Sequence, residues 1–118
     1  MPLDSGKPDL FIKASPEDRI IQRARELIAT PHTWCKWARA RDRHGIKLWR
    51  ANSRYAASFC ATTALKRATR ELGYSSLRYH RVIWQLGGRA RIVDVNDFGE
   101  KGLAGVHELF DKRLSLAR

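Results

Sequence analysis

The chain has little of what marks membrane, secreted or disulfide-stabilised proteins. Its 118 residues include two cysteines and one methionine, and no apolar run reaches membrane-spanning length. The first residues lack the basic-then-apolar order of a secretory signal. We therefore predict a cytoplasmic protein without membrane contact, in which Cys35 and Cys60 are reduced, buried side chains and do not form a disulfide.

Signals of catalysis and of metal binding are also scarce. There is no glycine-rich phosphate loop, and both cysteines lie in apolar surroundings that suit packing better than nucleophilic attack. His32 and Cys35 are close enough in sequence to share a metal ion. His44 and Cys60, however, add no paired ligand spacing. The sequence thus predicts no catalytic residue, no metal ligand and no cofactor, and it favours a binding protein over an enzyme.

Acidic residues are few, and the excess of positive charge lies in the middle of the chain. The net charge is +11, and residues 36–54 and 66–91 each hold seven Lys or Arg against one acid. Most of these are arginines, whose planar forks suit phosphate and stack on bases. We predict an arginine-rich face that binds DNA or RNA, the alternative being an ordinary solvated surface. The predicted contacts are Arg39, Arg41, Arg43, Lys47, Arg50, Arg54, Lys66, Arg67, Arg70, Arg78 and Arg81.

Caps and apolar spacing predict a mainly α fold with about four helices. They span roughly residues 15–30, 53–73, 75–87 and 103–117. The first is the best marked, with Ser15 as N-cap, Pro16 in the first turn and Asp18 completing a capping box. We expect a flexible arm over residues 1–14, then one compact domain over 15–118. An irregular Trp-rich segment follows the first helix, and residues 91–95 are predicted to be a short strand or extended crossover.

Residues 63–86, "TALKRATRELGYSSLRYHRVIWQL", have the outline of a helix-turn-helix. Such a motif needs two short helices with a glycine in the turn, here Gly73, and donors such as Arg78 and Arg81 on the second helix. Two features count against it. Thr69 replaces the small residue needed where the helices cross, and the first of the two predicted helices is too long. Two ordinary surface helices are therefore the favoured interpretation.

Tryptophans are interleaved with arginines over residues 34–50. This pattern occurs in stacking platforms for single strands or RNA, and also where tryptophans simply pack on a core. Packing is favoured for Trp34 and Trp37, and both interpretations stay open for Trp49. Trp49 and Trp84 are the predicted stacking or anchor residues.

An anion site is predicted where the second helix is expected to begin. Arg50 and Arg54 lie there although the macrodipole disfavours cations at a helix N-terminus. Because such a terminus itself binds anions, we predict phosphate or sulfate at Asn52, Ser53 and Arg54, with Arg50 closing over it.

Three fragments recur in a recognisable order: "TWCKWARARDRHG", "FCATTAL" and "IVDVNDFGEKGLAGVHELFDKRL". Together they resemble a family of small uncharacterised phage and bacterial proteins, over about residues 18–116. The matching positions are Trp34, Ala40, Arg41, Asp42, Gly45, Cys60, Ala61, Ala64, Leu65, Asn96 and Asp97, whereas Phe59, Thr63 and Val95 depart from the family's Trp, Gly and Trp.

The resemblance implies a compact, mainly helical domain and a mobile-element origin, and it supplies no catalytic residue. Asn96 and Asp97 also have a local interpretation, because such side chains bond to nearby backbone and start turns. A second function class follows from the resemblance. A phage-like accessory protein would bind an acidic host protein or complex, steered by charge and anchored by Trp49 or Trp84.

Overall fold

The first described helix, α2 (Pro16–Leu27), begins as its sequence predicts. In this computed structural model, which describes residues 14–116, Ser15 Oγ accepts a hydrogen bond from the Asp18 N–H at 3.1 Å. The Asp18 carboxylate accepts one from the Ser15 N–H at 3.3 Å, so the capping box is confirmed. The arm predicted for residues 1–14 lies outside the described residues except for Ala14.

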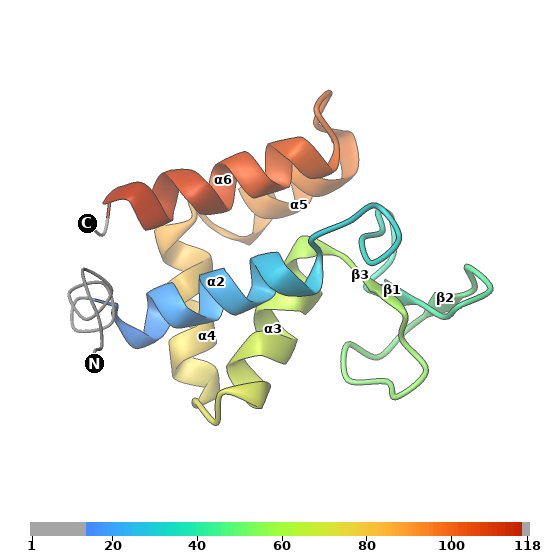
Figure 1. The fold of residues 1–118 in the computed structure, drawn as a ribbon, viewed down its shortest axis with the longest axis horizontal. Helices are drawn as coiled ribbons and strands as arrows, with labels where there is room; N and C mark the ends of the chain where they lie inside the picture. The colour runs from blue at the N-terminus through green and yellow to red at the C-terminus, as the bar shows by residue number, and fades with distance from the viewer. Residues whose placement is uncertain (1–13, 117–118) are drawn as a thin grey trace, which may run out of the picture.

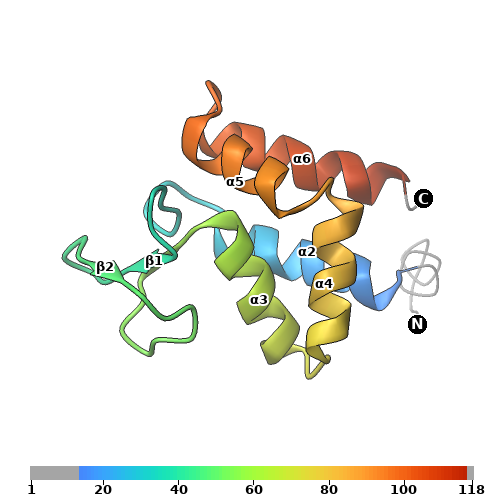
Figure 2. The same cartoon turned by 180° about the vertical axis from the view of Figure 1, so that it is seen from behind.

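Four further helices complete the described domain: α3 (Ala61–Glu71), α4 (Ser76–Gln85), α5 (Arg89–Phe98) and α6 (Leu103–Leu116). Helix α2 packs against α3, α4 and α6 (Figure 1), and α5 lies beneath α6 (Figure 2). Fully buried side chains between them include Ile20, Ile21, Ile28, Leu65, Val82, Ile92, Val106 and Phe110. The domain is compact and mainly α, as predicted. No helix within residues 14–116 is long and apolar enough to cross a membrane.

The fifth helix corrects the prediction for residues 91–95, which belong to α5 and form neither a strand nor an extended crossover. The β-branched run favours a strand locally, but Ile92 and Asn96 are both buried and are spaced by one helical turn. Packing of that face on the core therefore outweighs local propensity.

Two strands lie instead in the segment predicted to be irregular, and a third lies where the second helix was predicted to begin. The three are β1 (Ala40–Arg41), β2 (Lys47–Leu48) and β3 (Ser58–Phe59), arranged antiparallel in the order β2-β1-β3. The tight turn at "RDRHG" joins β1 to β2. There the Asp42 carboxylate accepts the N–H groups of His44 and Ile46 at 2.8 and 2.9 Å. These bonds, chiefly the one from Ile46, lower the pKa of Asp42.

The start of α3 also differs from the prediction. Asn52 and Ser53 lie among turns, and α3 begins only at Ala61, because Ser58 and Phe59 are paired with β1. The end of the helix is as predicted. Gly73 has φ +76°, its N–H donates to the Arg70 carbonyl, and the next N–H reaches back to the Thr69 carbonyl, which is a Schellman cap.

Candidate nucleic-acid interface

Asn96 joins segments that are far apart in the sequence. It is only 2% exposed, and its Oδ1 accepts the Trp34 indole N–H at 2.8 Å and the Ala61 N–H at 2.9 Å. Its Nδ2 donates to the Cys35 carbonyl at 3.1 Å and to Asp97 Oδ1 at 2.8 Å. The structural role predicted for Asn96 is therefore confirmed, but its backbone partners are distant and not nearby, and the three resembling fragments meet at this side chain.

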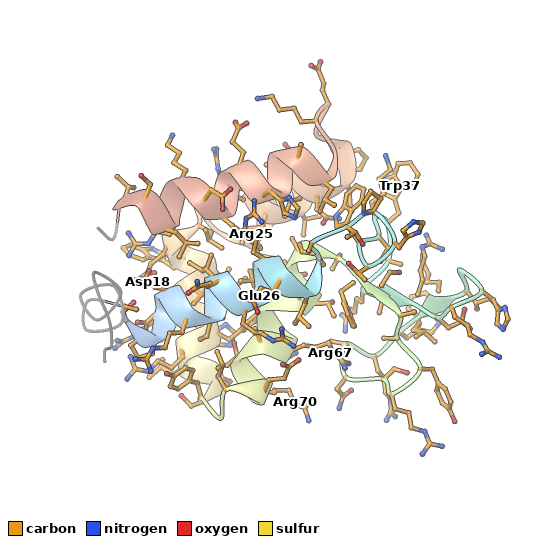
Figure 3. The ribbon with its side chains drawn as sticks, viewed as in Figure 1. Asp18, Arg25, Glu26, Trp37, Arg67 and Arg70 are labelled. Carbon is orange, nitrogen blue, oxygen red and sulfur yellow. The ribbon has the colours of Figure 1, made fainter. Side chains whose placement is uncertain are left out.

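Trp37 is held in an unusual backbone conformation next to this junction. Its φ is +62°, a left-handed value that is costly for a bulky residue, and its N–H donates to Asp97 Oδ1 at 3.0 Å. The side chain is 55% exposed and lies in the loop that follows α2 (Figure 3). Packing on the core, the favoured interpretation, is thus wrong for Trp37 but confirmed for Trp34, which is half-buried against the core.

A pocket of about 330 Å³ opens beside Trp37. It is lined by two exposed tryptophans and three cationic side chains from separate elements, above a floor that includes the start of α3 and the polar end of α5. These residues are Trp37, Arg39, Lys47, Trp49, Cys60, Thr62, Arg89, Asn96 and Asp97, among others. The pocket therefore brings together cations from both basic segments. Arg89 was not among the predicted contacts. The sequence feature that could have indicated it is the glycine pair just before it, which marks the start of a helix.

Basic side chains continue from the pocket toward α3 and α4. Burial raises the pKa of Tyr79, while the nearby charges of Arg89 and Arg39 act in the opposite direction. The Lys66 ammonium lies 5.9 Å from the centre of the Tyr79 ring. Tyr79 itself is buried at 8% exposure, so these three cations lie around an edge of the core where the phenol is covered.

Three predicted contacts have structural partners instead. Arg41 donates to the carbonyl of Gly45 in the β1–β2 turn and to that of Lys36 in the loop before β1. Arg67 (Figure 3) donates to carbonyls within residues 51–53. Arg78 pairs with the buried carboxylate of Glu17 at 3.0 Å. These three arginines therefore make contacts within the fold, and their role in binding nucleic acid stays a prediction. The pairing of Arg78 with Glu17 also leaves one donor fewer for bases on α4, the second helix of the helix-turn-helix outline.

The residues of the predicted anion site lie together, but the helix N-terminus on which that prediction was based is absent from this place. Asn52, Ser53 and Arg54 line a shallow hollow with Trp49 and Arg50. No helix begins there, so no macrodipole supports an anion. Of the remaining predicted contacts, Arg43 is exposed at the hairpin, and Arg70 and Arg81 are exposed on α3 and α4.

Comparison with known proteins places the chain in a family. No curated protein and no solved structure matches it. A family model covers residues 14–112 and is described as a family of unknown function, DUF6197. The chain belongs to this family. The match extends from α2 into α6, so the pocket and the Asn96 junction both lie inside the DUF6197 domain.

The two thiols of the DUF6197 domain should react differently. Burial raises the pKa of the Cys35 thiol to about 11, whereas Cys60 is half-buried and lines the pocket. Because the thiolate is the reactive form, we expect Cys35 to resist iodoacetamide at neutral pH and Cys60 to be modified first. Peptide mass spectrometry of the briefly treated native protein measures this. Faster labelling of Cys35 than of Cys60 would contradict it, and treatment in urea provides the equal-access control.

Proposed function

We propose that the protein binds DNA or RNA without transforming it, through a surface centred on Trp49. The Trp49 surface consists of Trp37, Arg39, Lys47, Trp49, Arg50, Arg54 and Arg89, which line the pocket and the adjoining hollow. The observation that carries the proposal is the convergence of Arg39, Lys47 and Arg89, from separate elements, on a pocket with two exposed tryptophans. Phosphate contacts supply most of the affinity for nucleic acid, and aromatic faces add stacking.

The local charge balance supports an anionic partner. Asp97 is the one carboxylate among the residues that line the pocket, and its Oδ1 accepts the Trp37 N–H and the Asn96 amide. Arg39, Lys47 and Arg89 form no salt bridge with a carboxylate of residues 14–116. Their charge is therefore available to phosphate.

The salt dependence of binding tests this proposal. If about five phosphates are contacted, the logarithm of the association constant should fall with log salt at a slope of about −3.5 on a single strand. The Arg39→Ala/Arg89→Ala double variant should make that slope shallower by about 1.4, because two contacts are lost. Fluorescence anisotropy of labelled DNA and RNA oligonucleotides measures both quantities.

A charge-matched control is available on other helices. Arg19 on α2 and Lys112 on α6 are exposed and line neither the pocket nor the hollow. The Arg19→Ala/Lys112→Ala variant should keep the wild-type slope. Equal losses in both double variants would indicate that only net charge matters, and absence of binding at low salt would refute the proposal.

A second candidate function rests on α4. Trp84 and Leu77 are 80% and 61% exposed and are seven residues apart, so they share one face of the helix. An accessory protein of a mobile element would use that face to anchor an acidic host protein. Affinity purification with and without nuclease separates the two candidates, because only nucleic-acid-bridged partners would be lost.

A further inference from the structure

We infer that the pocket takes one unstacked base, so that the preferred partner is single-stranded nucleic acid and not a duplex. This inference rests on the proposed function and adds the form of the ligand. A pocket of about 330 Å³ is at the small end of ligand sites, which span about 300–1,000 Å³. It has room for a single base with its phosphate. In a duplex the bases are stacked and paired, so none can enter without being extruded.

The two tryptophans are presented in the manner that stacking requires. Trp37 and Trp49 line the same pocket and are 55% and 76% exposed. The Trp37 N–H donates a hydrogen bond to Asp97, which fixes the backbone position from which the indole ring projects. Aromatic side chains beside a basic groove bind successive bases of a strand with little regard to sequence.

A lysine ammonium lies over each ring, within reach of the phosphate of a nucleotide whose base stacks there. The Lys36 ammonium is 4.6 Å from the centre of the Trp37 ring, and the Lys47 ammonium is 5.3 Å from that of Trp49. Arg39 and Arg89, the first residue of α5, line the same pocket. One nucleotide would thus meet an aromatic face through its base and cations through its phosphate.

The floor of the pocket adds a polar group that would meet the base edge. Asp97 Oδ1 already accepts two hydrogen bonds, and its Oδ2 accepts none from residues 14–116. A carboxylate oxygen accepts from an exocyclic amino group, as it does from cytosine N4. Bases that carry an amino group should therefore be favoured over thymine or uracil in this position.

The decisive experiment compares oligo(dC), oligo(dT), an RNA oligo(C) and a duplex of equal length with purified wild-type protein at one salt concentration. We expect the cytosine single strands to bind at least tenfold more tightly than the duplex. Trp49→Ala should weaken single-strand binding by about 5- to 150-fold, the range for loss of one stacked base. Trp37→Gly should act similarly, because glycine keeps the positive φ while removing the ring.

Trp84→Ala is the matched control, since Trp84 is equally exposed but does not line the pocket. It should bind like the wild type, and circular dichroism confirms that each variant is folded. If duplex and single strand bind alike and Trp49→Ala changes nothing, the base pocket is refuted while the proposed function stands. If no nucleic acid binds at low salt, both are refuted.

Discussion

Replacing Asn96 by alanine should lower the free energy of unfolding by about 3 to 5 kcal/mol. The side chain makes four hydrogen bonds at 2% exposure, and each contributes about 1 kcal/mol net. The variant also leaves the buried Ala61 N–H without its acceptor, which adds a desolvation cost. Total stabilities of domains are about 5–15 kcal/mol, so this change alone should bring the protein close to unfolding.

Urea denaturation followed by circular dichroism measures the loss of stability. Two further variants serve as a control and as a test of the hydrogen-bond explanation. Asn52→Ala removes an exposed asparagine from the loop and should change stability by less than about 0.5 kcal/mol. Asn96→Asp keeps acceptors for Trp34 and Ala61 but places a second carboxylate beside Asp97, 2.8 Å away. It should therefore be about as destabilised as the alanine variant at neutral pH. A loss below about 1 kcal/mol for Asn96→Ala would show that the junction is not structural.

Removal of the Arg78 guanidinium should cost about 2 to 3 kcal/mol at neutral pH, because it leaves the carboxylate of Glu17 buried without its partner. Burial by itself raises the pKa of Glu17. The hydrogen bond and charge of Arg78, with a backbone hydrogen bond, outweigh it and hold the pKa below its ordinary 4.5. The pair therefore stabilises the fold above about pH 4.5, and this stabilisation is lost as the pH falls through the lowered pKa.

The pH dependence of the Arg78→Ala variant distinguishes this ion pair from simple packing. Without Arg78, burial should raise the pKa of Glu17, so the carboxyl of the variant becomes neutral as the pH falls. The wild type loses its ion pair over the same range, and the difference in unfolding free energy between the two proteins should therefore narrow below about pH 4.5. Urea denaturation at several pH values measures the gap. Arg70→Ala, which removes an exposed arginine from α3, should give a small gap at every pH. A large gap for Arg78→Ala that does not change with pH would contradict the electrostatic explanation.

Elements with local signals were predicted from the sequence. The capping box of Ser15 and Asp18 and the glycine cap at Gly73 depend on residues within a few positions, so both ends could be located. The start of α3 and the whole of α5 could not. The first depends on β3 pairing with β1, and the second on Ile92 reaching the core, and both contacts join distant parts of the chain.

The candidate site divides in the same way. Composition indicated Arg39, Lys47 and Trp49, because arginine, lysine and tryptophan cluster in residues 34–54. Arg89 and Trp37 enter the site only through the approach of α5 to the loop after α2, which no sequence spacing encodes. Asn96 was interpreted through its neighbours in sequence, whereas its partners Trp34, Cys35 and Ala61 are 35 to 62 positions away.

The Asn96 junction also determines which parts of the molecule open together. The N-cap residue of α3, Cys60, makes no side-chain cap, and the first N–H of the helix is satisfied from α5 instead. Detachment of α5 would therefore fray the start of α3 and free the loop at Trp34 in the same event. Residues 34–37, the beginning of α3 and α5 form one cooperative unit, whose amides should exchange with solvent at a common opening free energy although no two of these segments are adjacent in the chain.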